Sequence, residues 1–495
     1  IPGAGKCDFA CKSPLTGGYA GASLGGIFTA EIKYAGLDSI IFEGISPKPV
    51  YLFIDDDKIE LRDASSLWGK GTFAVEKELK EQLGEEFQIA CIGPGGENGV
   101  TYAHINHDYG RQAGRGGVGT VMGVKKLKAI AIRGTQPIPV ADLNAYRRAG
   151  MALFDACKKS ELLRPWQQLG TTMVVSWCDE VGALPTRNFS TGNFEQATTL
   201  RGEYLREVVL KREGKVGTRC MPGCVIACRN EYVDETGKPI VGTLQFETIA
   251  LVGSNLGLGN LDDVAQLNYM CNDFGLDTIE TGAALGVAIE AGLARFGDFA
   301  SIRALLAQVG EGTVLGRVIG NGAVTTGRVL GIRRVPAVLG QAMPGYDPRT
   351  LKGNGVTYAT SPQGADHTAG NAFGARKEVN PLAVQGQKEL SLRLQIIAAM
   401  LDSTGLCLFA RPPIIADPQL MADMVNGLYG WGWTTQDLDQ FYRDVLRNEI
   451  EFNRRAGITA AQHRIPEYMR EEPLPPHNAV FDVPEADLDA VFDTL

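Results

Sequence analysis

Short apolar runs of strand length dominate the first 138 residues of the chain. They cover residues 39–42, 50–54, 87–90 and 129–132, and glycine, proline or charged residues interrupt the chain around them. An apolar run of this length between such breaks is typical of a buried β-strand. One stretch among them, residues 71–83, predicts a helix. We therefore expect the first part of the chain to be mainly β.

The periodicity changes after Pro137, Ile138 and Pro139. From there to the end, apolar residues recur at the i, i+3, i+4 spacing of amphipathic helices. The predicted helices cover residues 143–160, 261–274, 282–295, 299–310 and 389–401. A Gly- and Pro-containing break at residues 343–345 divides this helical part. The pattern predicts an α+β protein with a β-rich domain over 1–138 and two mainly helical domains over 139–342 and 343–495.

Composition and charge restrict the classes of function. The chain has 495 residues, of which 44% are apolar and 21% charged, so it can bury large cores in several domains. Its formal net charge of -9 argues against a general nucleic-acid binder, which needs a basic face. No apolar run reaches membrane-spanning length, and no secretion signal is visible. We expect a cytoplasmic protein with no nucleic-acid and no membrane partner.

Three of the ten cysteines fall within nine residues of one another. Cys220, Cys224 and Cys228 are each separated by three residues, and thiolates at close spacing are the usual ligands of iron–sulfur clusters. Three buried structural cysteines are the alternative. Zinc would need a CxxC pair and a second pair or a histidine nearby, which this stretch lacks. Cys407, which closes residues 402–407 (DSTGLC), is the candidate fourth ligand. That segment resembles residues 272–277 (NDFGLD), and each ends a predicted helix.

Residues 114–119 (GRGGVG) match the GxGxxG pattern of dinucleotide-binding loops. We reject that function because the fingerprint needs a strand before the loop and a helix that opens on it, whereas residues 107–113 are polar. A glycine-rich loop beside Arg115 suits a phosphate or another anion, since bare amides and a guanidinium both donate hydrogen bonds to it. A tight structural turn explains the same sequence equally well.

Glu247 and His367 are candidates for acid–base chemistry. Glu247 opens an otherwise apolar helix, where burial would raise its pKa and suit it to proton transfer. More often such a glutamate only satisfies a helix N-terminus. His367 is one of five histidines and lies in a polar loop, where a single histidine is usually a surface residue. Neither residue identifies a site by itself.

Taken together and in order, these segments resemble the tungsten-dependent aldehyde ferredoxin oxidoreductase family. The family-like segments are residues 12–17, 35–38, 92–98, 113–119, 121–130, 182–189, 220–228, 246–248, 275–278, 365–367 and 402–407. The resemblance implies that the β-rich first domain cradles two pyranopterins that share one tungsten, with two helical domains covering them. Compared with family members, the chain looks truncated at its N-terminus.

The resemblance also implies roles for the cysteines and for two aspartates. Asp277 and Asp402 match the pterin-binding carboxylates, and a carboxylate can accept the paired N–H bonds of a pterin edge. The ligands of a 4Fe-4S cluster match Cys220, Cys224, Cys228 and Cys407.

Further matches concern the pterin phosphates and the metal. Arg115, Gly116 and Gly117 match the loop at the pterin phosphates, which a magnesium ion bridges. Glu247 and His367 match polar residues beside the tungsten.

Four positions depart from the family's pattern. The first two cluster cysteines are separated by three residues instead of two. Asn272 stands where an aspartate is usual, and Ser23 stands where an asparagine is typical of the magnesium site. Residues 6–8, a Lys-Cys-Asp stretch, lie where an arginine is usual.

The implied reaction is the oxidation of an aldehyde to a carboxylic acid, with electrons leaving one at a time through the cluster to ferredoxin or an electron-transfer subunit. Glu247 would take a proton from water or a substrate hydroxyl, and His367 would donate a hydrogen bond, or the two roles are reversed. The alternative on the same cofactor is a low-potential reductase of an acid or an aromatic acyl thioester. A third class is an iron–sulfur electron-transfer subunit without substrate chemistry. The sequence is also compatible with a homo-oligomer.

Overall fold

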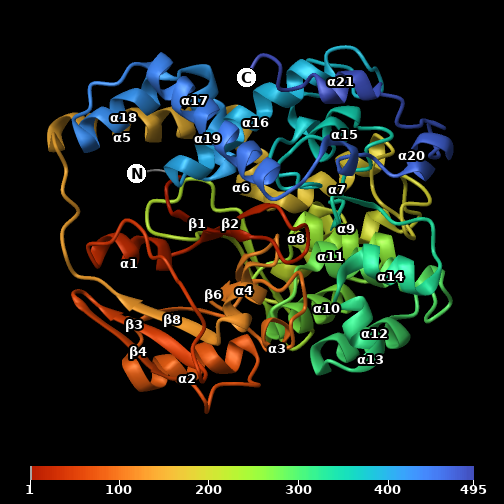
Figure 1. Ribbon diagram of the computed structural model, residues 1–495, viewed down its shortest axis with the longest axis horizontal. Coiled ribbons are helices and arrows are strands. Elements are labelled where there is room, and N and C mark those ends of the chain that lie inside the picture. Colours follow the sequence, from red (N-terminus) through yellow and green to blue (C-terminus); the bar gives the residue numbers. More distant parts are fainter. Residues whose placement is uncertain (1–2) are drawn as a thin grey trace.

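A six-stranded mixed sheet organises the N-terminal part of the computed structural model, which describes residues 3–495 (Figure 1). The strand order is β4-β3-β8-β5-β6-β7, in which β3 and β8 are parallel and all other neighbours are antiparallel. The strands are β3 (Val50–Asp55), β4 (Lys58–Asp63), β5 (Gln88–Cys91), β6 (Ile105–His107), β7 (Arg111–Ala113) and β8 (Leu127–Arg133).

Both faces of this sheet are buried. Tyr51 and Phe53 of β3 pack with helix α2 (Thr72–Leu83) on one face, while the intervening Leu52 and Ile54 point to the other. That second face is covered by a two-stranded hairpin and two helices: β1 (Lys6–Lys12), β2 (Tyr19–Gly25), α1 (Phe28–Tyr34) and α4 (Val118–Val124). The short helix α3 (Pro94–Glu97) follows β5. Burial on both faces explains why the strands read as continuous apolar runs.

The rest of the chain is mainly helical. Its larger core lies among α7 to α15, and a second core lies under α5, α16, α18 and α19, which Figure 1 shows above the sheet. The helices are α5 (Leu143–Lys159), α6 (Arg164–Leu169), α7 (Met173–Glu180), α8 (Gly202–Lys211), α9 (Phe246–Val252), α10 (Leu261–Phe274), α11 (Thr278–Glu290), α12 (Phe299–Glu311), α13 (Val314–Ile319), α14 (Gly322–Leu330), α15 (Lys352–Tyr358), α16 (Gln387–Thr404), α17 (Arg411–Ala416), α18 (Gln419–Tyr429), α19 (Thr435–Arg455), α20 (Glu467–Glu471) and α21 (Glu485–Asp489).

Two small antiparallel sheets interrupt the helices. One has the order β11-β10-β9, and the other pairs β12 with β13. Their strands are β9 (Lys215–Thr218), β10 (Arg229–Val233), β11 (Pro239–Val241), β12 (Ala337–Val338) and β13 (Gln341–Ala342). Over residues 3–495, no helix combines the length and the apolar character that a membrane crossing requires.

The α+β prediction is confirmed, and most predicted elements are present within a few residues. The helix predicted over 282–295 is α11, which begins earlier because Asp277 caps it. The strand predicted over 39–42 is wrong, since this segment is irregular and Ile41 is 82% exposed. An apolar run alone does not show whether the segment will pair with a neighbouring strand.

The loop at residues 114–119 has a different setting from the one we expected. A strand, β7, does precede it, and a helix, α4, does follow. However, β7 is an antiparallel strand at the edge of the sheet. A dinucleotide-binding loop belongs to a parallel βαβ unit, so the topology still excludes that function.

Candidate active site

The side chains of Glu247 and His367 face each other inside the helical part of the molecule. Glu247 lies in the first turn of α9, and its Oε2 accepts a 2.7 Å hydrogen bond from the backbone N–H of Gly345. Its Oε1 lies 3.5 Å from Nε2 of His367 and has no hydrogen-bond partner among residues 3–495, although it is buried. Burial raises the pKa of Glu247, and the nearby His367 opposes this rise. The pair therefore presents a buried carboxylate oxygen that is free to bind or take a proton.

Arg115 ties the loop that carries His367 to the rest of the site. Its Nε donates to Asp277 (3.2 Å), Nη1 donates to the carbonyl of Ala365 (2.6 Å), and Nη2 donates to the carbonyl of Ala342 (2.7 Å). Burial lowers the pKa of Arg115, but the surrounding carboxylates, led by Asp277, outweigh burial and raise it. Because Nε, Nη1 and Nη2 all donate to protein acceptors, the guanidinium holds the backbone at Ala342 and Ala365 in place around the site.

The backbone of the glycine-rich loop supplies free donors. Gly116 and Gly117 have φ of +73° and +76°, and a Cβ on Gly117 would lie 2.1 Å from the carbonyl oxygen of Thr101. Close packing therefore requires glycine here. The backbone N–H groups of residues 114–117 find no acceptor within the described part of the chain. Consecutive unpaired amides can bind an anion, so the conformation of this loop is compatible with both a tight structural turn and an anion site.

Asp277 and Asp402 occupy different environments. Asp277 caps α11 by accepting from the backbone N–H groups of Ile279 (3.0 Å) and Glu280 (3.2 Å), and burial raises its pKa. Asp402 lies in the last turn of α16, where water reaches it although protein surrounds it. Burial, followed by the nearby carboxylate of Asp8, raises the pKa of Asp402 to about 8. The carboxylate of Asp402 therefore caps no helix and can accept hydrogen bonds from a ligand, whereas that of Asp277 already accepts two from the first turn of α11.

The four candidate cluster cysteines belong to two distant segments that lie within electrostatic reach of each other. Cys220, Cys224 and Cys228 lie in the loop between β9 and β10. A hydrogen bond from Cys220 lowers the pKa of Cys224. Burial, followed by the charges of Cys407 and Cys224, raises the pKa of Cys228 to about 12. Cys407 is fixed by its backbone N–H, which donates to the carbonyl of Gly3 at 2.7 Å.

No three His, Cys, Asp or Glu side chains among residues 3–495 converge on a single metal ion. A 4Fe-4S cluster does not require such convergence, because its four thiolates bind an extended group of irons. The thiol arrangement is therefore compatible with a cluster and does not resemble a one-ion zinc site.

Three charged residues near the site were not predicted. Lys6, opposite Gly25 in the hairpin, lowers the pKa of Asp402 and of Cys407, and so lies within electrostatic reach of both. Asp366, beside His367, raises the pKa of Asp402. Glu280 accepts hydrogen bonds from two backbone amides, and burial raises its pKa to about 7. Asp366 could have been predicted because it is adjacent in sequence to His367. Glu280 could not, because no motif in the apolar helix α11 distinguishes it.

Before any comparison, these features define an α+β protein with a buried Glu–His pair, a glycine-rich loop with unpaired amides and a group of thiols. Two family models match the chain, the N-terminal domain of aldehyde ferredoxin oxidoreductase over residues 1–134 and domains 2 and 3 of the same family over residues 150–494. The chain belongs to the aldehyde ferredoxin oxidoreductase family.

Several known proteins are similar along most of the chain. Tungsten-containing aldehyde ferredoxin oxidoreductases of Pyrococcus abyssi and Pyrococcus furiosus are 34% and 33% identical, over 96% of this chain and 81% of each relative. The aliphatic sulfonate oxidoreductase WOR-like subunit of Pyrococcus furiosus is 28% identical over 82% of this chain and 68% of its own. The active-site complex BamBC of benzoyl-coenzyme A reductase has the same fold, with a TM-score of 0.79 at 20% identity, over 99% of this chain and 83% of the solved chain.

Proposed function

We propose that this chain oxidises an aldehyde to a carboxylic acid at a tungsten bis-pyranopterin centre and passes the electrons through a 4Fe-4S cluster to ferredoxin or an electron-transfer subunit. One aldehyde and one water give one carboxylic acid, two protons and two electrons. The observation that carries the proposal is the unpaired Oε1 of Glu247, which faces His367 at 3.5 Å inside the protein. A buried carboxylate oxygen without a partner is costly unless a ligand or a reaction uses it.

The residues present fit these cofactors. The free amides of residues 114–117 suit pterin phosphates with a bridging magnesium, and Asp277 and Asp402 offer carboxylate acceptors to pterin N–H groups. When bound, the tungsten centre supplies the two-electron oxidation chemistry. The four cysteine thiols suit the cluster. These donors, carboxylates and thiols are the protein groups that the proposed cofactors require.

The acid–base pair has a defined division of work in this proposal. Glu247 takes the proton that water or a substrate hydroxyl loses, because burial raises its pKa and makes it a stronger base than a free glutamate. His367 donates a hydrogen bond to a substrate oxygen. The Nδ1 of His367 is also unpaired within residues 3–495, and the carboxylate of Asp366 lies 3.8 Å from it. Arg115 holds the loop of His367 through the carbonyl of Ala365.

A low-potential reductase of an acid or an aromatic acyl thioester is the alternative on the same cofactor. The fold shared with the benzoyl-coenzyme A reductase complex is the observation that keeps this alternative in view. Elemental analysis of protein purified without oxygen, followed by assays with aldehydes and with aromatic acyl thioesters, tests both functions. Tungsten, iron and viologen reduction by an aldehyde support the proposal. Iron alone would instead indicate an electron-transfer subunit, and turnover of the thioester alone would indicate the reductase.

Removal of either aspartate should lower the tungsten content, but the two variants should differ in how much stability they lose. Asp402→Ala removes a pterin acceptor that makes no helix cap, so we expect less bound tungsten and an unchanged unfolding midpoint. Asp277→Ala removes the N-cap of α11 as well, and loss of an N-cap costs about 0.5–2 kcal/mol of unfolding free energy. Metal content and chemical denaturation measure the two effects. Full tungsten content in both variants would contradict a role in pterin binding.

A further inference from the structure

Four aromatic side chains form a row at the surface, from the end of α18 to the start of α19. Successive ring centroids lie 4.4 Å apart from Tyr429 to Trp431, 4.7 Å from Trp431 to Trp433 and 5.8 Å from Trp433 to Phe441. Tyr429, Trp431 and Phe441 are 47%, 52% and 39% exposed. Large aromatic side chains that gather at the surface are typical of protein–protein interfaces. We call these four residues the aromatic row.

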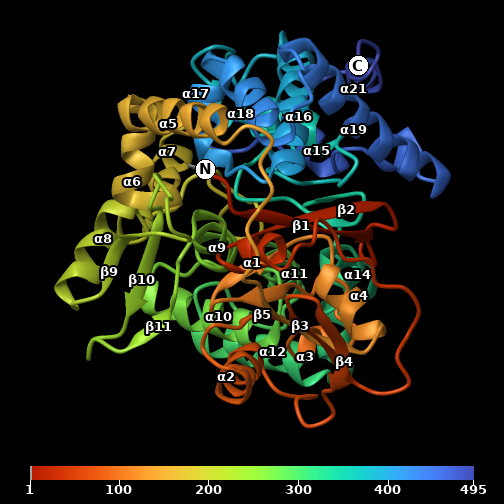
Figure 2. The ribbon, with the colours of Figure 1, turned by 90° about the vertical axis from the view of Figure 1, so that its left-hand side faces the viewer.

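A groove with a volume of about 610 Å³ lies beside the aromatic row, between α5 and the C-terminal end of α18. Both ribbon views place these two helices side by side at the periphery of the molecule (Figure 1 and Figure 2). They approach closely at Gly427, where a Cβ would lie 2.7 Å from the backbone nitrogen of Tyr146. The groove is lined largely by small residues, which are Ala145, Ala149, Ala152, Gly427, Gly430 and Gly432.

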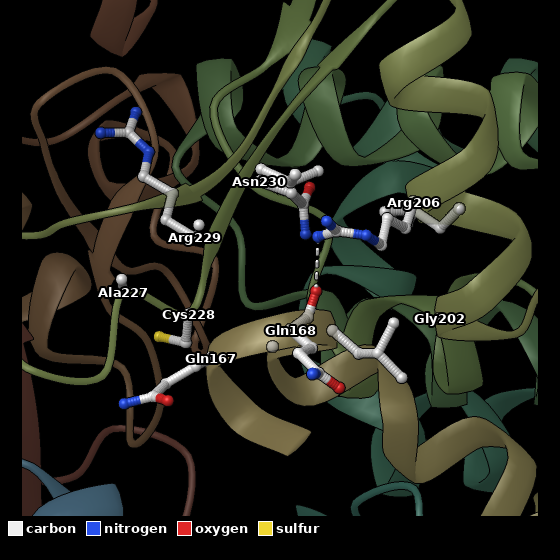
Figure 3. Close-up of a pocket in the computed structure, with 13 residues that line it drawn as sticks. Gln167, Gln168, Gly202, Arg206, Ala227, Cys228, Arg229 and Asn230 are labelled. Carbon is white, nitrogen blue, oxygen red and sulfur yellow. Dashed lines mark hydrogen bonds between the residues drawn. The ribbon is translucent and has the colours of Figure 1, made fainter. Parts of the chain in front are cut away.

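The groove has the size that large side chains of a partner need. Pockets that hold sizeable ligands have volumes of about 300–1,000 Å³, and the groove falls within this range. A pit beside Cys228 has a volume of only about 10 Å³, which is about the space of one water molecule. Arg206 closes one side of that pit by donating a 3.0 Å hydrogen bond to the carbonyl of Gln168 (Figure 3). The pit therefore admits no side chain, whereas the groove does.

The aromatic row and the groove adjoin each other, but the row does not fill the groove. Gly430 and Gly432 line the groove, whereas Trp431 between them does not. Its indole instead stacks on Tyr429 and Trp433. Two copies of a surface that meet across a two-fold axis must each supply both halves of the contact. A projecting aromatic group next to an open groove supplies both.

The charged residues of the groove are self-complementary in the same sense. The lining contains one guanidinium, that of Arg148, and two carboxylates, those of Asp142 and Asp423. None of the three forms an ion pair among residues 3–495. Across a two-fold axis, the guanidinium of each copy can face a carboxylate of the other, so the pair forms twice. A partner of different sequence would require only one half of each pair, so a second copy of this chain fits the groove better.

We propose that two copies of this chain associate through the aromatic row and the groove. Trp431 of each copy enters the groove of the other, and Arg148 of each copy pairs with a carboxylate of the other. The inference goes beyond the proposed function and does not depend on it, because the surface includes neither Glu247 and His367 nor the four candidate cluster cysteines.

The test is the oligomeric state of the protein purified without oxygen, measured by sedimentation velocity over a concentration series. Physiological ionic strength screens the net charge of -9 that each copy carries. We expect the parent to be a dimer. Tyr429→Ser with Trp431→Ser should raise the dissociation constant of the dimer about thirtyfold or more, which is the scale of an interface hot spot. Arg148→Glu should raise it about tenfold, because like charges then meet across the axis.

The matched control is Ile59→Ser with Leu61→Ser, which removes two exposed apolar side chains from β4. These residues are 53% and 65% exposed, and β4 lies in the lower part of Figure 1, away from α5 and α18. The control should dimerise like the parent. All variants should keep the metal content and the unfolding midpoint of the parent, since the substituted side chains are at the surface.

Hydrogen exchange locates the interface independently of the variants. On raising the protein concentration, the backbone amides of residues 142–152 and 423–432 should exchange more slowly, because the partner covers them. A parent that stays monomeric, or a dimer whose exchange is unchanged in these two segments, would overturn the proposal. So would a Tyr429–Trp431 double variant that dimerises as tightly as the parent, or an equal loss of dimer in the β4 control. None of these readouts requires aldehyde oxidation, so their failure is distinct from failure of the proposed reaction.

Discussion

Glu247→Gln should keep its tungsten and iron and lose most of its aldehyde oxidation, with kcat lower by about a hundredfold to ten-thousandfold. The substitution preserves the shape of the side chain and leaves an amide oxygen to accept from the N–H of Gly345, so the first turn of α9 should hold. What it removes is the carboxylate oxygen that faces His367 and has no other partner. Steady-state kinetics beside metal analysis measure the effect.

The pH dependence of the parent enzyme is the control for this assignment. A base works only when it is deprotonated, and burial raises the pKa of Glu247. Activity of the parent should therefore fall as the pH drops through this raised pKa, at a higher pH than for a free glutamate. Residual activity of Glu247→Gln should lack that acidic limb. Activity within about threefold of the parent would contradict a role as general base, which is typically worth far more.

Local pattern was sufficient for most helices and strands because their apolar residues are buried. The continuous apolar run of β3 and the helical spacing of α5, α10 and α16 each identified an element. The failure at residues 39–42 has a physical reason. Ile41 is solvent-exposed, and whether a run pairs with a sheet depends on strands that are distant in sequence.

The site was harder to predict because its residues meet only in three dimensions. Motifs identified Glu247 and His367, but only the fold shows that they lie 3.5 Å apart. Sequence assigned the Arg115 guanidinium to phosphate, whereas the structure gives its donors to Asp277 and two carbonyls. The free amides of residues 114–117 are a property of backbone conformation, which side-chain motifs describe only indirectly.

Cys407→Ser should lose the 4Fe-4S cluster or convert it to a three-iron form. The triplet in the β9–β10 loop has no fourth cysteine nearby in sequence. Cys407 lies within electrostatic reach of the triplet. Its charge contributes to the raised pKa values of Cys220 and Cys228, and the charge of Cys224 contributes to the raised pKa of Cys407. Serine is a far weaker ligand for iron than thiolate, so the iron at this corner should be released. Paramagnetic resonance and iron content distinguish the two cluster forms.

Cys157→Ser is the matched control for this variant, and the structure makes it a demanding one. Cys157 is buried on α5, and burial, followed by the charge of Cys407, raises its pKa to about 11, so Cys157 lies within electrostatic reach of Cys407. Cys271 lies instead beside Thr281 and Asp277 in the larger core. If Cys407 is the fourth ligand, Cys157→Ser should leave the four-iron spectrum unchanged. An unaltered four-iron signal in Cys407→Ser would move the fourth ligand elsewhere, and proximity then favours Cys157 over Cys271.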